Sequence, residues 1–205
     1  MNAAAGRIGP NAITRVAEVL PALFGAQRAE QVFVQAGLLS HWQHPPEAMV
    51  DETEVARLHA TLRATLGEAA ARRVAREAGT RTGDYLLAHR IPKPVQALLK
   101  RLPAALAARV LLAAITRHAW TFAGSGRFEA QAGRPVRLSI RANPMCKGLR
   151  SETPACDFYA ATFERLFRVL VHPASRVTET ACEACGADAC RFEIDWRGLE
   201  SKESP

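Results

Sequence analysis

The C-terminal third of this chain contains the stretch Cys182-Glu-Ala-Cys185-Gly-Ala-Asp-Ala-Cys190, with Cys156 upstream of it and Glu179 just before it. Four of the five cysteines therefore lie in a short part of the chain whose other residues are typical of one helix and a pair of strands. Thiols crowded in this way are typical of a metal site. The alternative is that they are buried thiols that behave as small apolar side chains.

Zinc prefers thiolate, imidazole and carboxylate ligands, and a structural zinc site is closed by four protein ligands. Cys182-x-x-Cys185-Gly has the form of a zinc knuckle. Cys190 begins the strand that follows, and Cys156 lies at the start of a predicted helix, where the positive end of the helix dipole favours a thiolate. The sequence thus offers five ligands, the four cysteines and Glu179, for four positions. Cys146 stands apart, and we expect it to be an ordinary buried thiol.

A zinc ion held by three thiolates and one carboxylate would have no open coordination position, so it would be a poor Lewis acid. We therefore expect the ion to be structural and to tie the helix to the strand pair. Metal binding contributes roughly 10–16 kcal/mol to folding in small zinc-dependent units, so the loss of one ligand should unfold this region.

Composition indicates one soluble globular domain, because 48% of the 205 residues are hydrophobic and 23% are charged. The formal net charge of +7 suggests an acidic partner, but the arginines are scattered, which argues against nucleic acid. The first residues lack the apolar run of a signal peptide, so we expect a cytoplasmic protein. The most apolar segment, Leu102–Phe122, carries Arg109, Arg117 and His118 and is expected to be a buried or pocket-lining helix, not a transmembrane span.

Apolar residues recur at helical spacing through the first 123 residues. The pattern predicts helices at Asn11–Phe24, from Asp51 or Thr53 to Leu66, at Glu68–Leu87, at Val95–Leu102 and from Pro103 to about Phe122. The segment Gly37–Pro46 ends in two prolines and is predicted to be a loop.

Beyond Gly126 the apolar period changes from 3.6 to 2, which predicts strands. We expect strands at Arg127–Gln131, Pro135–Arg141, Arg176–Ala181 and Ala189–Trp196, with a helix at Asp157–Val171. The fold class is therefore α+β, with helices packed on an antiparallel sheet of about four strands. We predict a single domain over residues 1–205, with a helical part at about 11–123, a strand-rich part at about 127–196 and a disordered tail at 197–205.

A family resemblance rests on the run Cys156-Asp-Phe-Tyr, then Val177-Thr-Glu179-Thr-Ala-Cys182, then Gly186 and Cys190-Arg-Phe192. These residues resemble the 4-vinyl reductase domain, a small-molecule-binding module related in fold to a vesicle-tethering subunit family. The same domain is the effector sensor of some bacterial transcription activators.

The resemblance implies the metal ligands Cys156, Glu179, Cys182 and Cys190, in the family's order Cys, Glu, Cys, Cys, and leaves Cys185 as the alternative ligand. Glu179 and Cys182 would point to opposite faces of a regular strand. Glu179 can therefore join the site only if the backbone bulges or turns between them.

The whole chain, including its opening Gly9-Pro10-Asn11-Ala12-Ile13, looks like the bacteriochlorophyll-biosynthesis members of this family. The resemblance implies reduction of the 8-vinyl group of a divinyl (proto)chlorophyllide. No Gly-x-Gly-x-x-Gly follows a strand, so the electron source would be a separate donor or weakly bound NADPH, and no catalytic residue is assigned. The alternative is a non-catalytic carrier or assembly factor that delivers the pigment intermediate to partner enzymes of bacteriochlorophyll biosynthesis.

In both cases the resemblance implies a magnesium tetrapyrrole ligand and a large apolar pocket lined by Trp120 and its helix. The central Mg²⁺ of such a pigment commonly takes a histidine as its axial ligand, which makes His118, His41 and His44 candidates. For each histidine the plainer alternative is a surface or hydrogen-bonded role. The fold relatives dimerise through helices, so a homodimer is an expectation, and the periphery of the photosynthetic membrane is an alternative location.

Overall fold

The structure is a computed structural model, and it describes residues 6–196. The helices are α1 (Asn11–Phe24), α2 (Ala26–Gln35), α3 (Leu39–Gln43), α4 (Glu52–Leu66), α5 (Glu68–His89), α6 (Lys93–Arg101), α7 (Ala104–Arg117), α8 (Trp120–Ala123) and α9 (Asp157–Leu170). The strands are β1 (Arg7–Ile8), β2 (Val50–Asp51), β3 (Arg127–Gln131), β4 (Val136–Arg141), β5 (Arg176–Ala181) and β6 (Cys190–Asp195). Two short 3₁₀ helices, η1 (Pro144–Cys146) and η2 (Glu183–Cys185), lie in the connecting loops.

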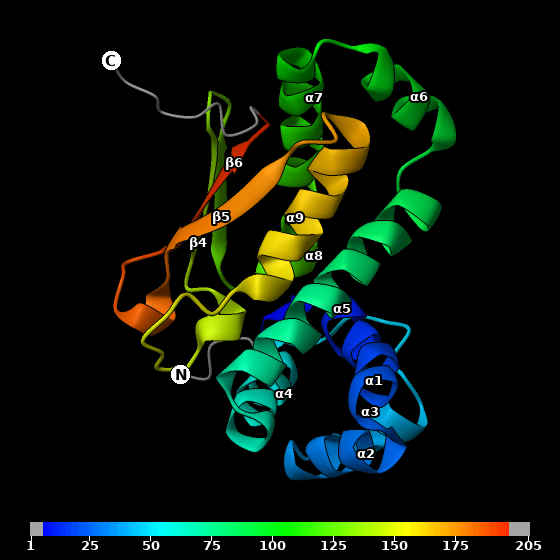
Figure 1. Ribbon diagram of the computed structural model, residues 1–205, viewed down its shortest axis with the longest axis vertical. Coiled ribbons are helices and arrows are strands. Elements are labelled where there is room, and N and C mark those ends of the chain that lie inside the picture. Colours follow the sequence, from blue (N-terminus) through cyan, green and yellow to red (C-terminus); the bar gives the residue numbers. More distant parts are fainter. Residues whose placement is uncertain (1–5, 197–205) are drawn as a thin grey trace, which may run out of the picture.

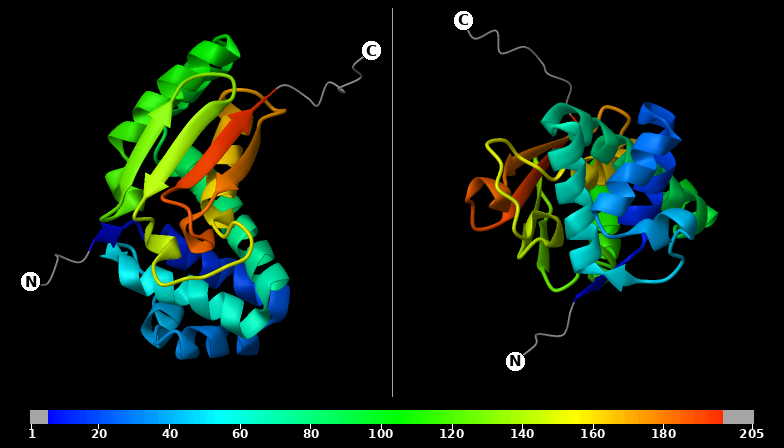
Figure 2. Two further views of the ribbon diagram at one scale, coloured as in Figure 1. Left: turned by 90° about the vertical axis from the view of Figure 1, so that its left-hand side faces the viewer. Right: turned by 90° about the horizontal axis from the view of Figure 1, so that it is seen from below.

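An antiparallel sheet in the order β3-β4-β6-β5 forms one layer of the fold. Its inner face is apolar because every second residue of β4 and β6 is buried, and Leu138 is paired with Phe192 across the two central strands. Helix α9 covers this face, where Phe163 packs edge-on against Phe192 with ring centroids 5.8 Å apart. Figure 2 (left) shows the sheet in front of α9. The α+β class and the four-stranded antiparallel sheet are confirmed.

Helix α5 packs closely along the other side of α9, and the two run side by side in Figure 1. Small residues allow this approach. A Cβ atom added to Gly79 would lie 2.3 Å from the backbone oxygen of Phe158, and one added to Gly83 would lie 2.6 Å from Cβ of Arg165. The hydroxyl of Thr162 donates a 3.0 Å hydrogen bond to the backbone oxygen of Gly79. The helix pair therefore depends on the glycine spacing i, i+4, which brings both glycines to one face of α5.

Glu52, the first residue of α4, ties the helical part to the loop that carries Cys146. Its carboxylate is only 1% exposed and accepts hydrogen bonds from the backbone and hydroxyl of Ser125, at 2.7 and 2.6 Å. Lys147 Nζ lies 3.1 Å from the same group. Burial raises the pKa of Glu52, but the bonds from Ser125 and Lys147 outweigh this effect and hold the pKa below its usual value. The carboxylate therefore stays charged while buried.

The structure corrects two of the predicted elements. The segment Gly37–Pro46 contains helix α3, because the chain turns helically before the prolines act. The long apolar helix predicted to reach Phe122 ends at Arg117, and α8 begins only at Trp120. The other helix and sheet predictions agree with the structure within about three residues. The predicted disordered tail, 197–205, lies outside the described residues.

Within residues 6–196, the helices fall short of the length and apolar character needed to cross a bilayer.

His59 is buried in α4 and gives the fold a dependence on pH. Its Nε2 lies 3.3 Å from the backbone oxygen of Ala12, and its ring packs edge-on against Phe158. Burial lowers the pKa of His59 to about 4, although the hydrogen bond to Ala12 opposes the shift. The unfolded chain, with a pKa of about 6.5, therefore binds a proton that the folded chain rejects.

We predict that His59 makes the protein less stable as the pH falls from about 6.5 to 4, by about 2 kcal/mol at pH 5. The substitution His59→Gln should flatten the pH dependence of the free energy of unfolding, measured by urea titration at pH 7.5 and pH 5. The exposed His89→Gln is the control and should keep the original slope. An unchanged slope in His59→Gln would refute this role.

Candidate functional site

Four buried thiols from separate chain segments meet at the end of the sheet near α9. They come from η1, from the residue before α9, from the end of β5 and from the start of β6, and are Cys146, Cys156, Cys182 and Cys190. All four sulfur atoms lie within 4.8 Å of one another. We call this set the cysteine cluster.

The sulfur separations match the spacing that a tetrahedral metal site requires. The closest pair, Cys146 and Cys156, is 3.3 Å apart, and Cys182 and Cys190 are 3.9 Å apart. A tetrahedral zinc ion with bonds of about 2.3 Å to sulfur places neighbouring sulfurs about 3.8 Å apart. Even 3.3 Å is far longer than the disulfide bond of about 2.0 Å, so these are free thiols. The residues therefore fit a metal ion, which the four thiols could hold.

Nitrogen donors around the cluster favour the thiolate forms that bind metals. The backbone amides of Ala155 and Glu183 each donate a hydrogen bond at 3.4 Å, to Cys182 and Cys190 respectively. The side-chain amide of Asn143 donates to Cys156 at 3.2 Å. Contacts of this kind orient metal ligands and stabilise their negative charge.

Protonation inside the cluster is uneven. Hydrogen bonds from the neighbouring thiols, first from Cys146, lower the pKa of Cys182, and the amide of Ala155 adds to this effect. Hydrogen bonds with Cys146 and then Cys182 raise the pKa of Cys156 well above its ordinary value. The cluster thus already favours some thiolate character, and a bound cation would favour it at all four sulfurs.

A bulge in β5 brings Glu179 to the same side as the cluster. Glu179 pairs with Phe192 and Ala181 with Arg191, so the strand holds one extra residue between the two pairs. The sequence analysis required such an irregularity for Glu179 to face Cys182, and the structure contains it.

The Glu179 carboxylate reaches the edge of the cluster. Its Oε2 accepts a 2.8 Å hydrogen bond from the backbone amide of Cys156, and its buried Oε1 has no hydrogen-bond partner among the described residues. Burial raises the pKa of Glu179 to about 9, and the charge of Cys182 adds to the rise. Such an unpaired buried oxygen is what a nearby cation would satisfy. Ligation by Glu179 remains a prediction.

Cys146 is the member of the cluster that the sequence analysis left out. Glu183, in η2, accepts hydrogen bonds from the backbone amides of Ala142 and Asn143 at 2.7 and 2.8 Å and so anchors the loop before η1. The Asn143 side chain then accepts a 3.0 Å bond from Met145 and starts the η1 turn. The sequence signal was Asn143-Pro144, a typical start for a helical turn.

Cys185, the alternative ligand, is exposed and lies outside the cluster. It ends the η2 turn, and Gly186 follows with φ of 90°, a conformation that favours glycine. The knuckle-like spacing therefore forms a tight turn, and this turn places Glu183 against the η1 loop.

The histidines proposed as pigment ligands lie apart from the cluster's sulfurs on exposed or half-buried positions. His118 follows the last residue of α7 and is exposed, and Trp120 next to it is 62% exposed. His41 is half-buried in α3 with its Nε2 3.2 Å from a carboxylate oxygen of Glu54, and His44 is exposed.

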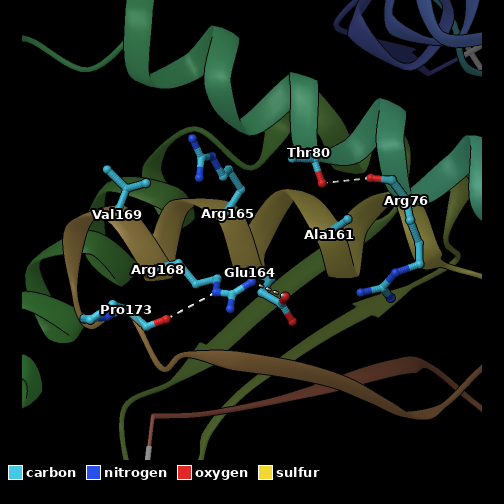
Figure 3. Close-up of a pocket in the computed structure, with 8 residues that line it drawn as sticks. All are labelled: Arg76, Thr80, Ala161, Glu164, Arg165, Arg168, Val169 and Pro173. Atoms are coloured by element: carbon cyan, nitrogen blue, oxygen red, sulfur yellow. Dashed lines mark hydrogen bonds and ion pairs between the residues drawn. The ribbon is translucent and has the colours of Figure 1, made fainter. Parts of the chain in front are cut away.

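A pocket of about 300 Å³ lies between α5 and α9 (Figure 3). Its polar lining includes Arg76, Glu164 and Arg168, and Arg168 donates a 3.2 Å hydrogen bond to the backbone oxygen of Pro173. A second pocket, of about 190 Å³, lies beside α7. Neither is lined by His118, Trp120, His41 or His44. The large apolar pocket expected for a pigment therefore remains a prediction.

Comparisons with known proteins agree with the cluster and the sheet around it. The family model of the 4-vinyl reductase domain matches residues 136–195, the span that holds β4, α9, β5 and β6. The "Bacteriochlorophyll synthase 23 kDa chain" of Cereibacter sphaeroides is 51% identical over 94% of this chain and 92% of its own. The chain belongs to this family. The protein of the same description from Rhodobacter capsulatus is 41% identical over 95% of this chain and 90% of its own.

Solved structures share the fold at low sequence identity. An Fe(II) unliganded H-NOX protein from K. algicida covers 95% of this chain and 99% of its own with a TM-score of 0.61 and 12% identity. An H-NOX protein from S. oneidensis in the Fe(II)NO ligation state has a TM-score of 0.54 and 11% identity, with 93% and 100% coverage. The chain thus has an H-NOX-like fold, and its relatives associate it with bacteriochlorophyll synthesis.

We predict that Cys156→Ser abolishes stoichiometric metal binding, because Cys156 contacts the other members of the cluster and is fully buried. Metal content per chain, measured by ICP-MS after a chelator wash, should fall from about one to near zero, and the protein should lose at least about 3 kcal/mol of stability. Cys185→Ser is the matched control and should keep the metal. Metal retained in Cys156→Ser, or absent from the unaltered protein, would contradict this assignment.

Proposed function

We propose that the protein binds a magnesium tetrapyrrole, a divinyl (proto)chlorophyllide, and presents it to partner enzymes of bacteriochlorophyll synthesis. The observation that carries this proposal is the similarity over nearly the whole chain to relatives described as a chain of a bacteriochlorophyll synthase. A protein described as one chain of a synthase works beside other chains. This supports a carrier or assembly role.

The fold gives further support. One H-NOX structure of the same fold, with a TM-score of 0.57, is described as a probe of heme distortion, and a heme is also a metal tetrapyrrole. The excess of basic residues suits the propionate group of the pigment.

His118 is the axial ligand that we favour for the pigment Mg²⁺. It is exposed, its side chain makes no hydrogen bond within residues 6–196, and Trp120 beside it offers an aromatic face for a macrocycle. His41 is already engaged with Glu54, which leaves its ring less free to bind a metal.

We propose zinc as the ion of the cysteine cluster, since four thiolates around one ion are typical of structural zinc. Such a site has no open coordination position, so the role of the ion is to stabilise the fold. Glu179 replacing Cys146 as the fourth ligand is the alternative, as the family's ligand order implies.

A second candidate function is reduction of the 8-vinyl group itself. The match to the 4-vinyl reductase domain family favours it, since the sequence resemblance associates this domain with vinyl reduction. Electrons would come from a separate donor or from weakly bound NADPH.

The test is to mix the purified full chain with divinyl protochlorophyllide, with and without NADPH, and to record absorbance and the product. We expect a spectral shift on binding and no turnover. The substitution His118→Ala should weaken binding about tenfold, the loss of roughly one good contact. His89→Ala, another exposed histidine at a helix end, is the control.

The outcomes separate the candidates. Turnover with NADPH alone would replace the carrier by the reductase. No spectral shift at any pigment concentration would refute both functions. Equal binding by His118→Ala and the unaltered protein would refute the axial-ligand assignment.

A further inference from the structure

The positive charge of this protein is concentrated in one segment. Residues 85–128 contain seven of the 27 lysines and arginines and none of the 20 acidic residues, since Asp84 and Glu129 flank the segment. Acidic and basic residues balance in the rest of the chain, so the formal net charge of +7 comes from this segment. We call it the basic segment.

Exposed apolar side chains gather in the same place. Of the large exposed hydrophobic residues that the structure describes, most belong to the basic segment, and these are Val95, Leu98, Leu106, Val110 and Trp120. Leu98 is 58% exposed, an unusual position for a leucine in a protein of this size. Charge and exposed apolar surface therefore coincide in one stretch of chain.

Helices α6 and α7 present these side chains at one end of the molecule. Figure 1 shows both helices at the end opposite α2, where α6 turns back into α7 at its outer edge. Val95 and Leu98 are three residues apart in α6, and Leu106 and Val110 are four apart in α7. Each pair therefore shares one face of its helix.

The basic groups of these helices are available to an outside partner. Within residues 6–196, none of the following forms an ion pair with an acidic side chain: Arg90, Lys93, Lys100, Arg101, Arg109 and Arg117. Elsewhere many arginines are paired, as Arg165 is with Asp84 at 2.6 Å. The unpaired charges would repel one another unless an anionic surface met them.

The smaller pocket, beside α7, adds a position suited to an anion. Its lining includes Arg109 from α7 and Arg134 from the turn between β3 and β4, and no acidic residue. The remaining lining residues are small or apolar. A phosphate headgroup would find two guanidinium groups there, next to the helix that exposes Leu106 and Val110.

We propose that the surface formed by α6, α7 and the Arg134 turn docks this protein on an anionic lipid bilayer. Short apolar side chains on a basic, acid-free helical surface are what interfacial membrane binding requires, since the side chains enter the headgroup boundary and the cations meet lipid phosphates. A protein partner would instead need a shaped apolar groove or matched acidic groups. This inference does not depend on pigment binding.

The experiment is flotation of the purified full chain with vesicles of phosphatidylcholine and phosphatidylglycerol, and with vesicles of phosphatidylcholine alone. We expect the protein to float only with the anionic vesicles, and binding to fall as salt rises, because salt screens the charges. The double substitution Lys100→Glu/Arg101→Glu should weaken partitioning about tenfold or more.

Matched controls separate a defined surface from net charge. Arg57→Glu/Arg73→Glu changes two exposed arginines of α4 and α5 and produces the same net charge, and it should bind almost as the unaltered protein does. Leu98→Glu should weaken binding, whereas Val34→Glu, a similarly exposed apolar position on α2, should not. Circular dichroism and metal content would show that each variant is folded.

Three results would overturn the proposal. These are no flotation with anionic vesicles, an equal loss of binding in both double variants, and unaltered binding in Leu98→Glu together with Lys100→Glu/Arg101→Glu. Capture by an acidic partner protein without any vesicle binding would assign the surface to that partner instead.

Discussion

Four thiols buried within 4.8 Å of one another set the constraint on which the strand-rich part depends. Thiolates so close together repel one another, and burial makes that repulsion costly unless a cation lies among them. The surrounding amides, from Ala155, Glu183 and Asn143, point at sulfur and not at oxygen. The loop, the start of α9 and the β5–β6 connection are therefore arranged around a charge that the four sulfurs share.

The cluster also determines how the two parts of the molecule meet. Cys146 is followed directly by Lys147, which reaches the buried carboxylate of Glu52 at the start of α4. Cys156 precedes α9, and α9 packs against both the sheet and the glycine face of α5. A disturbance at the sulfurs would thus reach the helical part through Lys147 and α9. The pigment ligand and bilayer surface that we propose lie on α6, α7 and the turn that follows, away from this brace.

Much of the fold could be predicted because its signals are local. Helical periodicity marked α1, α4, α5 and α9, and alternation marked the four main strands. The helix α3 was missed because Pro45 and Pro46 suggested a loop, although proline does not prevent a turn that ends before it. The break after Arg117 gives no clear local signal.

The cluster could be predicted only in part. Cys156, Cys182 and Cys190 were found from their spacing, but Cys146 is held beside them by Glu183, which binds the amide of Ala142 across 41 residues of chain. Such a long-range hydrogen bond leaves no local trace in the sequence. The bulge beside Glu179 was inferred as a requirement of the family's ligand order, and periodicity alone gave no sign of it.

The central claim is that one ion is held by the four sulfurs of the cluster. X-ray absorption spectroscopy at the zinc edge of the purified protein tests it most directly. Our account predicts a first shell of four sulfur atoms at about 2.3 Å. A shell of three sulfurs and one oxygen at about 2.0 Å would show that Glu179 is the ligand instead of Cys146, and the absence of bound metal would contradict the account altogether.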